Sequence, residues 1–152
     1  MGHSKAEKAK SHDRVVRVAA ARFRETGVDG VGVADLMRDA GLTHGGFYGH
    51  FASRDELVAE AIELALHDGA QAVDAVAKSN LSRSSLLAKL IDVYLSAAHR
   101  DGLATSCAVT TLAGDVARSG FGQRDGHFSE QLRRPTRRSW HRAWPCSRSR
   151  PP

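Results

Sequence analysis

Residues 40–51 place the strongest constraint on what this chain can fold into. They read Ala-Gly-Leu-Thr-His-Gly-Gly-Phe-Tyr-Gly-His-Phe. Gly41 can take the positive-φ conformation that ends a helix, and Thr43 can cap the helix that follows. Phe47 and Phe51 lie four residues apart, so they share one face of that helix, which we expect to point inward.

Three glycines make this short helix depend on its packing. Gly45, Gly46 and Gly49 each lower helix stability by about 1 kcal/mol relative to alanine. A free peptide would therefore not stay helical, and Leu42 with the two phenylalanines must hold the segment against a core. The missing side chains would let the backbone approach another surface, whereas the alternative is a loop that is simply rich in glycine.

The outer face of this short helix keeps four polar side chains, which are Thr43, His44, Tyr48 and His50. A tight turn followed by such a helix is typical of the second half of a helix-turn-helix.

The spacing of apolar residues predicts two helices before this stretch. The first begins at Ser11 and ends at Gly27, and residues 1–10 form a polar, basic arm that we expect to be flexible. The second begins near Val33, with Gly32 at its N-cap position. A helix-turn-helix with an additional helix in front of it is therefore predicted.

The residues after the stretch predict further helices. Ser53 and Glu56 have the spacing of a capping box, and the helix that they open can run on to Val76. Amphipathic patterns over residues 86–98 and 109–117 predict two more helices. No segment has the pattern of a strand, so the predicted fold class is all-α.

The positive charge of the chain is unevenly distributed. Residues 1–120 carry 14 Lys and Arg against 15 Asp and Glu, whereas residues 121–152 carry 8 Arg against Asp125 and Glu130. Residues 1–24 nevertheless hold 7 Lys and Arg against 2 acidic residues. This local basic start, rather than the net charge of +5, is the feature that would attract a polyanion.

The end of the chain changes in composition. All 4 prolines and both tryptophans lie in residues 135–152, among many arginines. Such a mixture cannot bury a core face, so we expect residues 121–152 to form an Arg/Pro-rich, disordered tail. One interpretation is a tail that binds nucleic acid. The favoured hypothesis is an out-of-frame translation of another helix, which the other reading frames of the parent DNA would test.

Composition limits the remaining function classes. No apolar run reaches the length of a membrane span and the start lacks the apolar region of a signal peptide, so we expect a cytoplasmic protein without a membrane partner. Cys107 and Cys146 have no metal-ligand spacing, so neither a metal nor another cofactor is expected. An enzyme would need a pair such as Cys107 and His99, for which no orienting acid motif is present, so enzymatic activity is not expected.

Three motifs carry a family resemblance. They are Ala40-Gly41-Leu42-Thr43, Phe47-Tyr48-x-His50-Phe51 and Ser53-Arg54-Asp55-Glu56-Leu57. With them, residues 11–71 resemble the DNA-binding domain of the tetracycline-repressor (TetR/AcrR) family of bacterial transcriptional regulators. The resemblance implies a helix-turn-helix domain over residues 11–71, including the start of a fourth helix, and a partial helical regulatory domain over residues 72–120.

The resemblance implies a sequence-specific regulator, expected to be a ligand-released repressor that binds a palindromic operator in double-stranded DNA as a homodimer. It implies seven DNA-binding residues, which are Thr43, His44, Gly45, Gly46, Tyr48, His50 and Arg54. Thr43, Tyr48, His50 and Arg54 would contact phosphates, His44 a phosphate or a base edge, and the glycines would allow close backbone approach. As alternatives, Tyr48 packs beneath the domain, His50 caps local backbone, and Arg54 is an ordinary solvated residue.

The resemblance also implies a small-molecule effector, whose identity the sequence does not disclose. Candidate ligand-binding residues are Leu86, Leu90, Tyr94, Cys107 and Leu112, although core packing explains the same pattern. Family members usually carry further dimer-forming helices where this chain has its arginine-rich tail. The second hypothesis is therefore a truncated, frame-disrupted member that folds at its N-terminus but neither dimerises nor represses, and the third is a general nucleic-acid binder that works through the tail.

Overall fold

A computed structural model of the chain describes residues 5–79 and 82–119. The elements are α1 (Lys5–Thr26), η1 (Val28–Gly30), α2 (Val33–Asp39), η2 (His44–Gly49), α3 (Arg54–Ala77), α4 (Arg83–Tyr94), α5 (Ala97–Asp101), η3 (Leu103–Thr105) and α6 (Ala108–Ser119), where η marks a 3-10 helix. These residues contain no strand, which confirms the all-α fold class. The predicted disordered tail, residues 121–152, lies outside the described residues.

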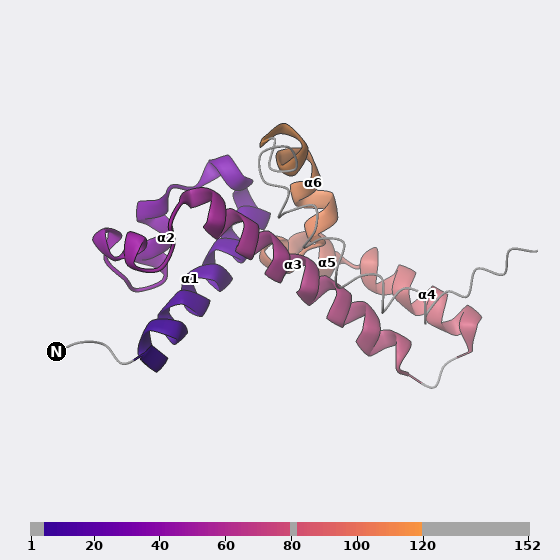
Figure 1. Cartoon of the computed structure of the whole chain (residues 1–152). Helices are drawn as coiled ribbons and strands as arrows, with labels where there is room; N and C mark the ends of the chain where they lie inside the picture. Colours follow the sequence, from indigo (N-terminus) through magenta and orange to yellow (C-terminus); the bar gives the residue numbers. More distant parts are fainter. Residues whose placement is uncertain (1–4, 80–81, 120–152) are drawn as a thin grey trace, which may run out of the picture.

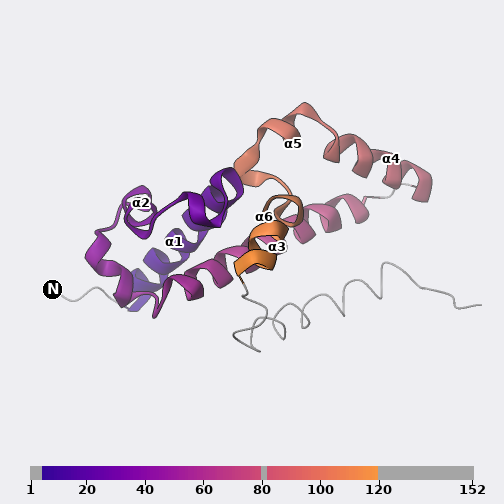
Figure 2. The same cartoon turned by 90° about the horizontal axis from the view of Figure 1, so that it is seen from above.

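Two crossing helices, α1 and α3, form the framework of the molecule (Figure 1). The helix α2 and the segment η2 close one end of this framework, beside the first half of α1 and the start of α3. From the far end of α3 the chain turns back, and α4 runs antiparallel to the second half of α3 (Figure 2). The chain then returns through α5 and η3, and α6 packs on α1 and α3. The segment η2 thus lies at the opposite end of the molecule from α4.

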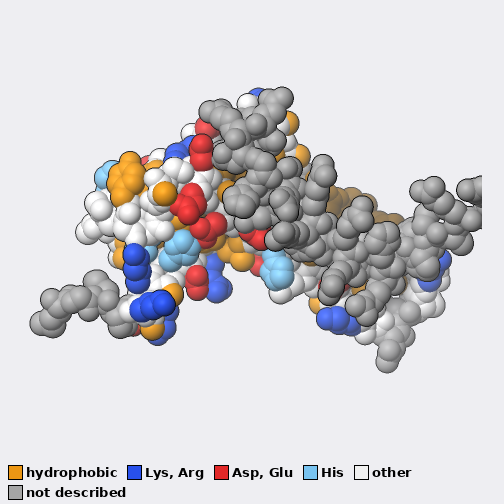
Figure 3. All heavy atoms as spheres, in the orientation of Figure 1, with side chains coloured by type: hydrophobic (Ala, Val, Ile, Leu, Met, Phe, Trp, Pro, Cys, Tyr) orange, Lys and Arg blue, Asp and Glu red, His pale blue; other side chains and the backbone are white. Residues whose placement is uncertain are grey.

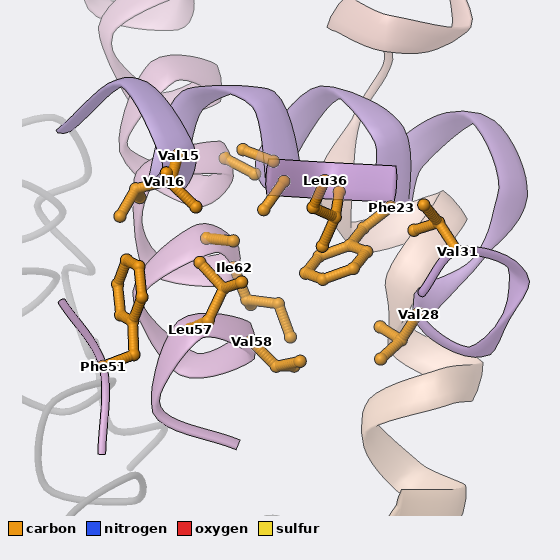
Figure 4. Close-up of a cluster of buried hydrophobic side chains, with 14 of the residues drawn as sticks. Val15, Val16, Phe23, Val28, Val31, Leu36, Phe51, Leu57, Val58 and Ile62 are labelled. Carbon is orange, nitrogen blue, oxygen red and sulfur yellow. The ribbon is translucent and has the colours of Figure 1, made fainter. Parts of the chain in front are cut away.

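The hydrophobic core lies where α1, α2, η2 and α3 meet (Figure 4). Its largest fully buried side chains are Phe23, Phe47, Phe51, Leu36, Met37, Leu57, Leu112, Val15 and Val58. Each large apolar side chain that is removed from water stabilises the fold by about 1.5–3 kcal/mol. Because Leu112 belongs to α6, the core also ties the last described helix to the first domain.

The local signals for helix ends at Gly32, Gly41 and Ser53 are confirmed. Gly41 has a φ of 69°, as expected for a residue that ends a helix in the left-handed region, and Gly32 is the N-cap of α2. The Ser53 hydroxyl accepts a hydrogen bond from the backbone N–H of Glu56 at 3.1 Å. The carboxylate of Glu56 in turn accepts from the backbone N–H of Ala52 at 2.5 Å, one residue before the N-cap.

The first helix begins earlier than the sequence indicated. It starts at Lys5 rather than at Ser11, so residues 5–10 are helical. All six side chains are exposed, and Glu7 and Lys10 form an ion pair at 3.9 Å. Apolar periodicity could not reveal that residues 5–10 are helical, because none of their side chains is buried. Their Lys, Ala and Glu residues nevertheless favour a helix intrinsically. The flexibility of the arm stays a prediction.

The single helix predicted over residues 86–98 is wrong, because the chain breaks into α4 and α5 there. Ser96 is the N-cap of α5, and its hydroxyl accepts from the backbone N–H of His99 at 3.1 Å and donates to the carbonyl of Val93 at 2.8 Å. A serine that offers local hydrogen bonds competes with the helical ladder. Since α4 has no buried residue, packing does not override this competition.

Candidate nucleic-acid interface

The recognition segment, defined as residues 43–51, is built on the 3-10 helix η2. Its turns are closed by hydrogen bonds from the N–H of Gly46 to the carbonyl of Thr43 at 3.0 Å and from the N–H of His50 to the carbonyl of Phe47 at 2.8 Å. Three glycines make a regular α-helix unfavourable here, so a short 3-10 helix is a reasonable outcome. Thr43 occupies the N-cap position but its side chain makes no capping bond, so the predicted hydroxyl cap is wrong.

Two aromatic rings anchor the recognition segment from inside, as predicted. Phe47 is 2% exposed and Phe51 is 1% exposed, and their stacked rings have centroids 5.4 Å apart. Figure 4 shows Phe51 beside the core residues Leu57 and Val16. In the turn before the segment, the N–H of Leu42 donates to the carbonyl of Met37 at 2.8 Å. The anchors therefore hold a segment whose own helical propensity is low.

The outer face of the recognition segment is open to solvent. Thr43, His44 and Gly45 are exposed, and Tyr48 is 76% exposed. The Tyr48 ring touches the edge of Phe47 at a centroid distance of 5.3 Å, but the interpretation that Tyr48 is packed beneath the domain is wrong. The segment thus offers a hydroxyl, an imidazole, a phenol and bare backbone to an incoming surface.

Arg54 does not lie on this open face as a free cation. Its guanidinium donates to the carbonyl of Val28 at 2.6 Å and to the carbonyl of Val31 at 3.3 Å, and it lies 3.7 Å from the carboxylate of Asp29. The interpretation of Arg54 as an ordinary solvated residue is therefore wrong. Its observed bonds fasten the start of α3 to the loop before α2, and its phosphate contact stays a prediction.

His50 lies in a half-buried position near the end of the recognition segment. Its Nδ1 atom is buried and has no hydrogen-bond partner in the described part of the chain. Burial lowers the pKa of His50 from its ordinary value, and the nearby charges of His12 and Lys8 lower it further. Around neutral pH the free protein therefore carries His50 in its neutral form.

Sequence reasoning did not identify His12 of α1, which faces His50 and Phe51, or its partner Glu60 of α3. The Nε2 atom of His12 lies 2.7 Å from a carboxylate oxygen of Glu60, and the His12 ring stacks on Phe51 with centroids 4.4 Å apart. His12 precedes the buried Val15 by three positions, so helical periodicity alone could have placed it on the inner face of α1.

Positive side chains gather on the first half of α1, next to the recognition segment (Figure 3). The exposed cations of this helix are Lys5, Lys8, Lys10, Arg14 and Arg17. Phosphate groups are attracted to such a cluster without regard to base sequence. The open polar segment and the basic helix therefore offer adjacent surfaces for a nucleic acid.

A comparison with known families decides what this arrangement is. Residues 15–61 match the family model described as bacterial regulatory proteins, tetR family. These residues are similar to the DNA-binding domain of that family. The matched residues include the inner face of α1, the turn, the recognition segment and the first turns of α3. The match and the fold support a DNA-binding transcriptional regulator with a helix-turn-helix domain. A search of curated proteins finds no match to the chain.

The five candidate ligand-binding residues do not all gather at one site. Leu90 and Tyr94 line an open apolar hollow of about 380 Å³ together with Val73, Ile91 and Leu95. Leu112 lies in the main core instead, where it is 1% exposed, and Leu86 is half-buried on α4. Periodicity identified apolar helix faces correctly, but it could not tell which face meets the core.

Cys107, half-buried, directly precedes α6. Burial tends to raise the pKa of its thiol, but hydrogen bonds from the backbone of Thr110 and Val109 and from the side chains of Thr110 and Tyr94 outweigh burial and lower the pKa. The thiol is thus connected to the hollow through Tyr94.

The described residues contain no group of three or more His, Cys, Asp or Glu that could hold a metal ion. Within the same ranges, every helix is too short or too polar to cross a bilayer.

Proposed function

We propose that this protein is a repressor of the tetR family that binds a palindromic operator as a homodimer and leaves it when a small molecule binds. One observation carries the proposal, namely that Phe47 and Phe51 are buried while Thr43, His44 and Tyr48 of the same segment are exposed. A polar surface on a rigidly anchored segment is what a duplex groove accepts. The DNA target also suggests a cytoplasmic location.

The recognition segment supports distinct roles for its residues. The hydroxyls of Thr43 and Tyr48 donate to phosphates and fix the register of the protein on the duplex. His44 reaches a base edge, where it selects sequence. Gly45 and Gly46 have no side chain beyond Cα, so the DNA backbone or a base edge can come close to the peptide at these positions.

The basic first half of α1 supports fast, salt-dependent association. Its exposed lysines and arginines attract the duplex before the recognition segment engages it. In the proposal Arg54 also contacts a phosphate. Its guanidinium either gives up its hydrogen bonds to the carbonyls of Val28 and Val31 or reaches the phosphate while it keeps those bonds.

The homodimer is supported by two considerations. A single DNA-binding module buries only about 600–1,000 Å², and useful affinity comes from reading two half-sites at once. In addition, α4 exposes the large apolar side chains of Leu87 and Ile91, and its C-cap residue Leu95 is exposed as well, so a second copy would remove them from water. The open hollow that Ile91 and Leu95 line together with Leu90 and Tyr94 is the proposed effector site.

Selection from a random-sequence DNA library with the purified chain tests the proposal. We expect enrichment of an inverted repeat, and the replacements Tyr48→Ala and His50→Ala should weaken binding to that repeat and to unrelated DNA alike. Lys78→Ala is the matched control, because Lys78 is exposed just beyond the far end of α3. Enrichment of no sequence, or unchanged affinity of both variants, would contradict the proposed interface.

Oligomeric state separates the competing hypotheses. Light scattering should report a dimer in solution or on the selected repeat, whereas a monomer in both conditions would favour the truncated, non-repressing member. Deletion of residues 133–152 should leave binding to the repeat intact. Loss of all binding on that deletion would instead support the general binder that works through its tail.

A further inference from the structure

We infer that His12 is a positioning residue for DNA recognition, which holds the His50–Phe51 end of the recognition segment in place through Glu60 and through the ring of Phe51. The inference rests on the proposed function, because it assumes that the recognition segment meets DNA. It adds two residues, His12 and Glu60, that belong to neither half of the helix-turn-helix.

The first support is the bond between two helices that frame the segment. His12 in α1 and Glu60 in α3 are joined at 2.7 Å, with 28% and 36% of their side chains exposed. A charge-assisted bond of this length is stronger than a neutral one, and partial burial shields it from salt. It therefore fixes α1 against α3 directly beneath the recognition segment.

The second support is a row of three aromatic rings. The ring of His12 stacks on Phe51 at 4.4 Å, and Phe51 stacks on Phe47 at 5.4 Å. The row leads from α1 into the middle of the recognition segment without a gap. A change in the position of the His12 ring is therefore passed to the backbone that carries Tyr48 and His50.

The third support is the surroundings of His50. The His12 and His50 rings lie 6.3 Å apart, and the charged groups around them are Lys8 on α1 and Glu60 on α3. Positive charge on His12 or Lys8 opposes protonation of His50, whereas a DNA phosphate favours it. Operator binding should therefore take up a proton, and affinity should increase as the pH falls below neutral.

Four variants of the full chain test the inference. His12→Phe keeps the ring stack and removes the bond to Glu60, while His12→Gln keeps a polar group near Glu60 and removes the ring. Glu60→Gln keeps size and removes charge. His67→Gln is the matched control, since His67 is an exposed histidine of α3 that bonds Gln71.

The measurement is affinity for the selected repeat by fluorescence anisotropy between about pH 5.5 and about pH 8, the range in which histidine changes charge. We expect His12→Phe and Glu60→Gln each to weaken binding about threefold to tenfold, which corresponds to the loss of one hydrogen bond. His12→Phe should also move the increase in affinity to higher pH, because one positive neighbour of His50 is gone. His12→Gln should weaken binding and move the profile in the same direction.

The pH profile distinguishes positioning from mere stabilisation, because a loss of fold stability leaves the midpoint of the proton uptake in place. Thermal unfolding of each variant identifies those that do not fold, and Glu60→Gln, which keeps the shape of a half-exposed side chain, carries the test if His12→Phe does not fold. Wild-type affinity of both His12→Phe and Glu60→Gln, together with an unshifted pH profile of His12→Phe, would overturn the inference. If Tyr48→Ala still weakens binding in that case, the proposed function stands. If Tyr48→Ala and His50→Ala are also without effect, the proposed function itself fails.

Discussion

The carboxylate of Asp115 accepts a hydrogen bond from the backbone N–H of Val28 at 3.0 Å. The carbonyl of the same Val28 accepts from Arg54 at 2.6 Å. Both backbone polar groups of Val28 are thus satisfied by side chains, one from α6 and one from the start of α3. The loop between α1 and α2 is therefore held from two sides, and α6 is attached directly to the DNA-binding domain.

Replacing Asp115 with alanine should lower the free energy of unfolding by about 1–3 kcal/mol, because the part-buried N–H of Val28 loses its partner. Chemical denaturation checks this. Asp101→Ala is the control, since Asp101 is an exposed residue paired with Arg100, and fully exposed ion pairs contribute little to stability. Equal, small effects of the two replacements would show that the Asp115 bond adds little.

Phe47→Ala should lower the free energy of unfolding by about 3–5 kcal/mol, because it removes a ring that the surrounding core cannot replace. Thermal unfolding followed by circular dichroism measures the effect. Val109→Ala, at an exposed position of α6, should change stability by no more than about 0.5 kcal/mol. A Phe47→Ala protein as stable as the Val109→Ala protein would contradict the anchoring role.

Gly45→Ala should separate stability from DNA binding. An added Cβ at Gly45 meets nothing within 4 Å and the residue has no positive φ, so stability should be unchanged or higher by up to about 1 kcal/mol. Affinity for the operator should nevertheless fall, because the methyl group would stand between the backbone and the DNA. Gly69→Ala, equally free of neighbours but in the middle of α3, should raise stability and leave DNA affinity as it is.

Tyr48→Phe should leave the thermal midpoint unchanged, since the ring is 76% exposed. Its affinity for the operator should fall about tenfold or more, because a hydrogen bond to a charged phosphate contributes about 1.5–3 kcal/mol. The loss should be similar on operator and unrelated DNA, as a phosphate contact carries no sequence information. A loss confined to the operator would assign Tyr48 to base recognition instead.

As the pH falls, protonation of His50 should lower the stability of the free protein, whereas it should raise the affinity for DNA. Because burial, His12 and Lys8 lower the pKa of His50, the unfolded chain binds a proton more readily than the folded one. The stability that neutral His50 contributes is therefore present above its ordinary pKa of 6.5. It is lost as the pH falls through the lower pKa that His50 has in the folded protein. Thermal midpoints measured against pH should decline less steeply in this range for His50→Gln than for the wild type.

The sequence by itself determined the features that depend on neighbours within a few residues. The inward pair Phe47 and Phe51, the positive φ of Gly41 and the cap formed by Ser53 and Glu56 all follow from spacing along a single helix or turn. These local rules were sufficient for the all-α class and for the position of the recognition segment. The family match over residues 15–61 covers the same local motifs.

Only the tertiary structure decided which partners the longer-range residues have. Arg54 turns to the carbonyls of Val28 and Val31, His12 bonds Glu60, and Leu112 enters the core rather than the hollow. Each of these outcomes depends on the angle at which two helices cross and on which face meets the neighbour. Periodicity gives the apolar face of a helix but not its partner, because side chains far apart in sequence meet only once the helices have packed.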